Sequence, residues 1–199
     1  MIKENYNLAF KRQIHKLRPI SSSDIAEILE TCEKNPRLHL VRDIVRILAN
    51  TGLRNSELTS LRISQVDIIG RWVTIVEGRK APAIRKIPLG PKTIAAIASL
   101  HSMNPESPFV LGEFPNRRMR IVIARLRSMW PRLSHDRLLL HRVRINFACR
   151  LMRAGIPIGV VSYCLGRRDI SRLFGRLALS PDERLDIVRR NLERFVNEL

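Results

Sequence analysis

The chain has 199 residues, enough for one compact domain with a buried core, and it carries a formal net charge of +18. So large a positive excess favours a polyanionic partner. No apolar run is long enough to cross a membrane, which excludes a membrane-embedded class of protein. Three cysteines, far apart in the sequence, exclude a disulfide framework and a zinc site. We therefore expect a soluble cytoplasmic protein with no membrane partner, no metal and no cofactor.

The positive excess is mostly arginine, since no Lys follows Lys92 while Arg recurs as far as Arg194. The guanidinium group is planar and permanently charged, and it suits phosphates and the edges of guanine. We therefore expect nucleic acid as the partner rather than a membrane surface. A GC-rich genome that favours Arg codons would give the same excess without any partner.

The first part of the chain predicts an arm followed by helices. Residues 1–19 are polar and basic, which is typical of a flexible arm. Ser21, followed three residues later by Asp24, is a capping-box variant that opens a helix with an apolar stripe. Residues 40–52 predict a second helix with a glycine as its stop, and a third helix begins near Asn55.

The middle of the chain predicts a hairpin. Residues 72–76 are β-branched and aromatic, which favours a strand, and residues 84–89 predict a second strand. In that second strand Ile84 and Lys86 alternate with Arg85 and Ile87, so the two pairs should face opposite ways. The intervening residues 77–83 predict the hairpin loop. Helical periodicity then returns, with helices expected at 92–100, 117–129, 143–154 and 158–165.

The last residues carry the clearest helix pattern. Ser180-Pro181-Asp182-Glu183 supplies an N-cap, a proline in the first turn and acidic residues at the positive end of the helix. An apolar stripe follows from Leu185 to Leu199. We expect a mainly α-helical domain with a small antiparallel β-sheet over residues 20–180, followed by an amphipathic helix over residues 181–199. That helix could dock on a neighbouring protomer in a homo-oligomer or fold back on its own core.

Two blocks of sequence carry the most specific pattern. The first is T-G-L-R-N-S-E-L, from Thr51 to Leu58; the second is H-R-V-R, from His141 to Arg144, followed by Leu-Gly-Arg ending at Arg167. Together they resemble the active-site framework of the tyrosine recombinases, the phage integrase family. The resemblance covers roughly residues 20–180, which corresponds to the catalytic domain alone, as in the short fimbrial-switch invertases. The resemblance implies the fold of a tyrosine recombinase catalytic domain, double-stranded DNA as the partner, and a prokaryotic, nucleoid-associated location.

The resemblance implies a phosphate-binding set. In the family a tyrosine attacks a phosphodiester, and positioned cations stabilise the charge that develops on the phosphate oxygens. Arg54, Arg144 and His141 match the two arginines and the histidine of that set. His141 and Arg144 are three residues apart, nearly one helical turn, so both side chains can reach one phosphate. Each of these residues is also compatible with an ordinary basic surface.

The hairpin loop should carry the lysine that the family uses as a general acid. Gly78-Arg79-Lys80 stands there, so either Arg79 or Lys80 occupies the lysine position. Arginine would be a poor general acid because its pKa is too high to release a proton. A solvated hairpin tip explains the same residues equally well.

The bond-breaking positions depart from the family pattern. Arg167 stands where the family has a histidine, and Arg176, nine positions further on, stands where it has the nucleophilic tyrosine. The chain has two tyrosines, Tyr6 in the basic arm and Tyr163, for which we expect a role in packing or at the surface. Loss of both positions to arginine removes chemistry and adds affinity for phosphate, although sequence drift would give the same result.

We therefore expect a catalytically deficient DNA-binding protein, a pseudoenzyme that regulates recombination or transcription or serves a mobile element as an accessory factor. One alternative is an active recombinase with an unaligned or partner-supplied nucleophile. Another is a nonspecific basic or RNA-binding protein. Further DNA contacts are expected from basic residues of the hairpin and of the predicted helices: Arg79, Lys86, Arg117, Arg118, Arg120 and Arg142.

Overall fold

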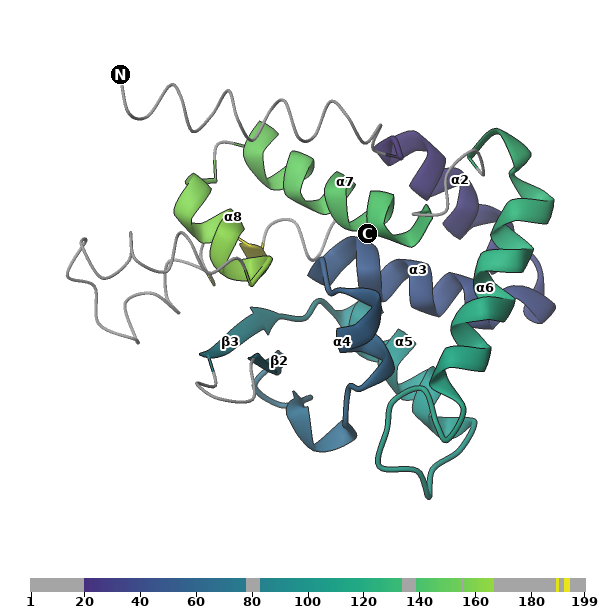
Figure 1. Ribbon diagram of the computed structural model, residues 1–199, viewed down its shortest axis with the longest axis horizontal. Coiled ribbons are helices and arrows are strands. Elements are labelled where there is room, and N and C mark those ends of the chain that lie inside the picture. Colours follow the sequence, from purple (N-terminus) through teal and green to yellow (C-terminus); the bar gives the residue numbers. More distant parts are fainter. Residues whose placement is uncertain are drawn as a thin grey trace.

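The fold is mainly helical with one small antiparallel sheet, as the sequence predicts (Figure 1). The predicted arm and most of the predicted C-terminal helix lie outside the residues that the structure describes. The computed structural model describes residues 20–77, 83–133, 139–154, 156–166, 189 and 192–193. Within these ranges no helix is long and apolar enough to span a bilayer.

The helices follow the predicted order. They are α2 (Ser22–Glu33), α3 (His39–Thr51), α4 (Asn55–Thr59), α5 (Pro91–Ser102), α6 (Pro115–Met129), α7 (Leu139–Arg153) and α8 (Ile158–Cys164). Single turns of 3₁₀ helix, which the sequence analysis did not predict, occur at Pro36–Leu38, Ile63–Gln65 and Pro131–Leu133. Helix α7 begins four residues before the predicted start, so that His141 and Arg142 lie within its first turn.

Two helix ends show how local sequence sets the boundaries. The hydroxyl of Ser21 accepts a hydrogen bond from the backbone N–H of Asp24 at 2.9 Å, which forms the predicted capping box of α2. Gly52 ends α3 with φ of 61°, a left-handed conformation that favours glycine. A Cβ at this position would lie 2.3 Å from Cδ1 of Phe147 on α7. The glycine therefore also permits the close approach of α3 and α7.

The sheet has the order β1-β2-β3, with strands at Val66–Asp67, Trp72–Glu77 and Ala83–Pro88. Val73 pairs with Ile87, and Ile75 pairs with Arg85; these four side chains are buried on the inner face. The alternating residues, among them Lys86, lie on the outer face, as the alternation predicts. The short strand β1 was not predicted, because two residues carry no readable alternation.

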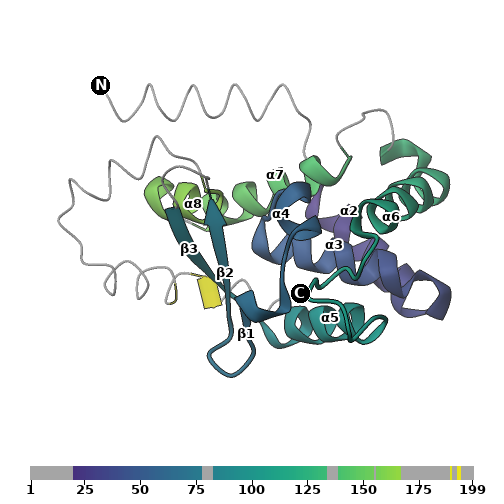
Figure 2. The ribbon, with the colours of Figure 1, turned by 60° about the horizontal axis from the view of Figure 1, so that its bottom comes forward.

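The core is built around α3, which contacts α2, α5, α6 and α7. The sheet stands at one end of the molecule beside α8, while α2, α3 and α6 fill the other end (Figure 2). A second cluster of buried residues joins α7 to α8 and includes Phe147, Leu151 and Val161. Leu192, near the C-terminus, is also buried in this α7–α8 cluster, and Trp72 of β2 packs against it.

Candidate functional site

A single carboxylate, that of Glu57, lies at the centre of the candidate site. Arg54 is the N-cap residue of α4, and Glu57 stands in the first turn of that helix. The backbone N–H of Arg54 donates to Oε2 of Glu57 at 2.7 Å, and the guanidinium of Arg54 donates to Oε1 at 2.5 Å. The sequence T-G-L-R-N-S-E-L thus forms a helix stop, a short turn and a helix start that bring these two side chains together.

Two further arginines reach the same carboxylate from distant parts of the chain. Arg85 of β3 donates from Nη2 to Oε2 of Glu57 at 2.7 Å. Nη1 of Arg144 on α7 lies 3.6 Å from the same oxygen. Three guanidinium groups therefore surround one carboxylate, and we call Arg54, Arg85 and Arg144 the arginine cluster. The fold brings together the two arginines that the sequence analysis proposed and adds a third.

Each arginine of the cluster also donates to a carbonyl at the end of α8. Arg85 donates to Cys164 at 3.0 Å, Arg144 to Leu165 at 2.5 Å and Arg54 to Gly166 at 2.7 Å. The last carbonyls of a helix have no partner within the helix and carry a partial negative charge. The Leu-Gly pair is therefore held by both sequence blocks, Leu165 by Arg144 of the second block and Gly166 by Arg54 of the first.

The electrostatics of the cluster leave a positive site. Burial alone would raise the pKa of the Glu57 carboxyl, but hydrogen bonding and charge from Arg85, together with Arg54, lower that pKa to about 2. Glu57 is therefore ionised at neutral pH and balances one of the three positive charges. The side chains of Arg85 and Arg144 are 3% and 7% exposed, whereas that of Arg54 is 40% exposed. Arg54 is thus the member of the cluster most accessible to an incoming anion.

Helix α7 also carries His141 and Arg142, the other two polar residues of the block H-R-V-R. His141 is half-buried and lies one turn before Arg144 on the same helix. Arg142 donates from Nη1 to the carbonyl of Leu133 at 2.7 Å, which ties α7 to the preceding 3₁₀ turn. The side chain of Arg142, which the sequence analysis expected to bind DNA, therefore makes a structural hydrogen bond within the fold.

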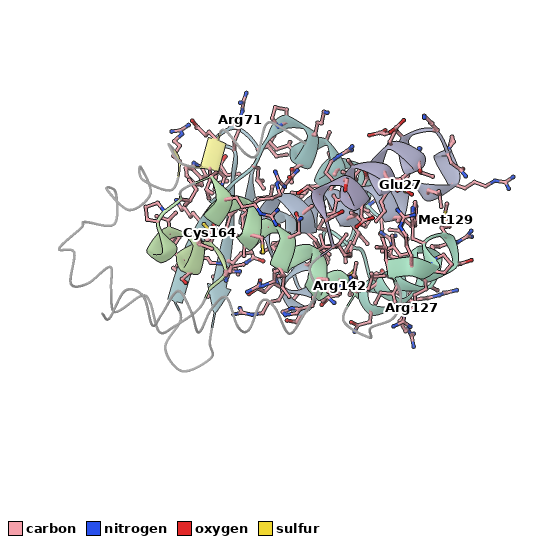
Figure 3. The ribbon with its side chains drawn as sticks, turned by 90° about the horizontal axis from the view of Figure 1, so that it is seen from above. Glu27, Arg71, Arg127, Met129, Arg142 and Cys164 are labelled. Atoms are coloured by element: carbon pink, nitrogen blue, oxygen red, sulfur yellow. The ribbon has the colours of Figure 1, made fainter. Side chains whose placement is uncertain are left out.

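Helix α6 contacts α4 and carries five arginines and no acidic residue. Arg117 and Arg120 are exposed, whereas Arg118 is half-buried and donates to the carbonyl of Leu100 at 3.5 Å. Arg127 of α6 and Arg142 of α7 lie on one side of the molecule, opposite Arg71 (Figure 3). The basic residues expected from this helix are thus divided between solvent and a structural contact.

The main chain of Lys86 meets Tyr163 at the free edge of β3, the last strand of the sheet. The backbone N–H of Lys86 donates to the hydroxyl of Tyr163 at 3.0 Å, and the ring of Tyr163 packs against the α7–α8 cluster. The side chain of Lys86 lies on the face opposite to Arg85, because successive residues of a strand alternate between its faces, and so points away from the arginine cluster. The remaining proposed site residues, Arg79, Lys80, Arg167 and Arg176, lie outside the described residues.

The sequence analysis did not identify Arg85 as a site residue. Its signal was present in the alternation of β3, where a charged residue shares the inner face with Ile87. A buried charge is costly unless it is paired, so an arginine at an inward strand position indicates a nearby carboxylate. Glu57 entered the sequence analysis only as part of the first block, although all three arginines of the cluster lie around its carboxylate.

Structural comparison defines the class of the fold. The crystal structure of XerA recombinase is similar with a TM-score of 0.61 and 20% identity, covering 86% of this chain and 64% of that one. The Tn1549 transposon integrase in complex with circular intermediate DNA also gives a TM-score of 0.61, at 19% identity, covering 79% of this chain and 59% of that one. The fold is that of a tyrosine recombinase catalytic domain.

The sequence comparisons define the family. The model of the phage integrase family matches residues 18–175, and the chain belongs to this family. Tyrosine recombinase XerA of Thermococcus kodakarensis is 33% identical over 138 residues, covering 65% of this chain and 48% of the relative. The tyrosine recombinase of Pseudothermotoga lettingae is 29% identical over 177 residues, covering 86% and 59%. The chain thus spans about half the length of the curated relatives that it matches.

Proposed function

We propose that this protein binds double-stranded DNA, holds a backbone phosphate at Arg54 and Arg144, and does not cleave the strand. It would act as a regulator or accessory factor in recombination or transcription. One observation carries the proposal: the arginines of the phosphate-binding set lie together around Glu57, while arginine stands at the expected tyrosine position, Arg176.

The chemistry of the arginine cluster supports phosphate binding. Guanidinium groups bind phosphate through two parallel hydrogen bonds and keep their charge at any physiological pH. Arg54 is partly exposed, and its contact with the carbonyl of Gly166 can be exchanged for a stronger contact with a charged phosphate oxygen. The net charge of +18 adds a long-range attraction to the DNA backbone.

The environment of Tyr163 supports the absence of cleavage. Tyr163 and Tyr6 are the two tyrosines of the chain. The hydroxyl of Tyr163 accepts a hydrogen bond from the backbone N–H of Lys86 at the free edge of β3, whereas the side chain of Arg85 meets Glu57 from the inner face of the sheet. A nucleophile must lie within about 3.5 Å of the phosphorus in line with the leaving oxygen, and the hydroxyl of Tyr163 is instead held by the backbone of β3.

The test begins with selection of bound genomic fragments, followed by a nicked version of the selected sequence that traps any covalent adduct. We expect specific binding and no adduct. Arg144→Ala should weaken binding by about 1–3 kcal/mol, because one charged phosphate contact is lost. Unchanged affinity of Arg144→Ala would remove Arg144 from the DNA surface. Equal binding to selected DNA, random duplex and RNA would favour a nonspecific nucleic-acid-binding protein.

An active site-specific recombinase is the second candidate, because the curated relatives are named tyrosine recombinases and the arginines that stabilise the transition state are retained. It would need an unaligned nucleophile or one supplied by a partner. The nicked substrate separates the two candidates. An adduct that forms with the wild type and is lost in Tyr163→Phe or Tyr6→Phe would establish cleavage and overturn our proposal.

A further inference from the structure

Arg85 connects two parts of the candidate site, Glu57 and the end of α8, from the buried side. Its side chain is 3% exposed on the inner face of β3, so it is not positioned to contact DNA. It donates from Nη2 to Glu57 on α4 and from Nε to the carbonyl of Cys164 at the end of α8. One buried guanidinium thus links α4 to the end of α8, and Arg54 and Arg144 contact these same two elements.

The contacts of Glu57 show what Arg85 does for its neighbours. Oε1 accepts from the guanidinium of Arg54, and Oε2 accepts from the backbone of Arg54 and from Arg85. Nη1 of Arg144 stays 3.6 Å from Oε2, beyond hydrogen-bonding distance. Arg85 therefore supplies a hydrogen bond to this oxygen that Arg144 would otherwise be drawn in to provide.

We propose that Arg85 is a positioning residue of the phosphate site, which holds Glu57 from the buried side so that Arg54 and Arg144 keep the spacing and charge to bind a DNA phosphate. The inference rests on the proposed function, because it concerns the same phosphate. Without Arg85, one carboxylate would be shared by two arginines instead of three, and the positive charge offered to the phosphate would fall. Arg144 would also close on Glu57, because a buried carboxylate attracts the nearest cation.

The test is a double-mutant cycle between Arg85 and Glu57, read as DNA affinity over a range of salt concentrations. We expect Arg85→Met to weaken binding by about tenfold and to lower the log–log salt slope by about one unit, although Arg85 does not touch DNA. In a Glu57→Gln background, the cost of losing Arg85 should fall below about twofold, because no carboxylate is left to draw in Arg144.

A purely structural role for Arg85 predicts a different pattern. The cost of Arg85→Met would then be the same in both backgrounds, and that result would overturn the inference. If Arg85→Met alone does not fold, Arg85→Lys replaces it in the cycle, since lysine keeps the charge but lacks the planar fork with which arginine donates to Glu57 and to the carbonyl of Cys164. An equal cost of Arg85→Lys with and without Glu57→Gln is likewise contrary to the inference.

Two controls keep this inference separate from the proposed function. Arg46→Met removes another arginine of low exposure, paired with Glu33 at 2.6 Å, and should lower stability without changing DNA affinity. Arg144→Ala reports on the phosphate site itself. If it leaves DNA binding unchanged, the proposed function fails; if it weakens binding while Arg85 and Glu57 show no coupling, only the positioning role of Arg85 fails.

Discussion

Glu57 shows how one residue can link stability to the geometry of a site. Its carboxylate is buried and accepts hydrogen bonds from Arg54 and Arg85, which hold its pKa at about 2 instead of the ordinary 4.5. A group whose pKa is lower in the folded state adds stability that is fully present above its unfolded pKa. That stability is lost as the pH falls through the folded pKa.

Glu57→Gln should therefore change the acid dependence of folding. The pKa difference corresponds to about 3 kcal/mol of stability at neutral pH, which the wild type should lose between about pH 5 and pH 2. Urea unfolding at several pH values measures this directly. We expect the gap between wild type and Glu57→Gln to narrow as the pH falls, and a gap that stays constant would mean that Glu57 does not titrate in this window.

Gly52 gives a second prediction at the scale of a residue. Its φ of 61° and the 2.3 Å that would separate a Cβ from the ring of Phe147 both disfavour any side chain. Gly52→Ala should lower the free energy of unfolding by about 2–4 kcal/mol, through backbone strain and overpacking together. Adding Phe147→Leu should relieve only the overpacking. Thermal unfolding of both variants separates the two contributions, and a neutral Gly52→Ala would contradict the local geometry.

At the scale of elements, α6 packs against the core with one face and presents basic side chains to solvent with the other. Met119, Val122 and Leu126 are buried, while Arg117 and Arg120 are exposed. Its contact with α4 connects this basic surface to the helix that Arg54 caps. We infer that α6 extends the phosphate-binding surface beyond the arginine cluster, because cations near the site add counterion release to DNA binding.

Replacing Arg117 and Arg120 together with glutamine should lower the log–log salt slope of DNA binding by up to about two units, one for each phosphate contact. The change should leave stability nearly unaltered, because both side chains are exposed. Arg71→Gln is the control, since Arg71 is exposed and lies on the side of the molecule opposite Arg127 of α6 (Figure 3). Equal slopes for the double variant and the control would remove α6 from the DNA-binding surface.

At the scale of the whole molecule, Leu192 and Arg189 pack against elements that lie far from them in the sequence. Leu192 is fully buried in the α7–α8 cluster, and the guanidinium of Arg189 lies 5.8 Å from the ring centroid of Trp72. Residues near the C-terminus therefore cover part of the same elements that position Arg144 and the end of α8. Of the predicted apolar stripe the structure describes Leu192, and for the stripe as a whole we propose the second of its two expected roles, that of folding back on its own core.

Leu192→Ala should lower the free energy of unfolding by about 2–4 kcal/mol, because it leaves a cavity among packed side chains. Glu193→Ala, at an exposed neighbouring position, should change it by less than about 0.5 kcal/mol. The midpoint of urea unfolding should not depend on protein concentration if the contact forms within one chain. A midpoint that rises with concentration would instead indicate docking on a second copy.

The elements of this fold could be predicted because their signals are local. The capping box at Ser21, the glycine stop at Gly52 and the alternation of β3 each act within a few residues, and the structure confirms all three. Strand β1 and the start of α7 were missed or misplaced. A two-residue strand depends on its partner, and the sequence analysis placed the start of α7 at Val143, after the first turn that the structure shows from Leu139.

The sequence by itself determined the family, the mainly helical fold and the arginines at both ends of the candidate site. Only the tertiary structure showed that Arg54, Arg85 and Arg144 share one carboxylate and donate to three consecutive carbonyls at the C-terminal end of α8. The physical reason is that a motif records which side chains are available along the chain. The pairing of buried charges depends on distance in space, and only packing decides which cation neutralises Glu57 and which remain for a phosphate.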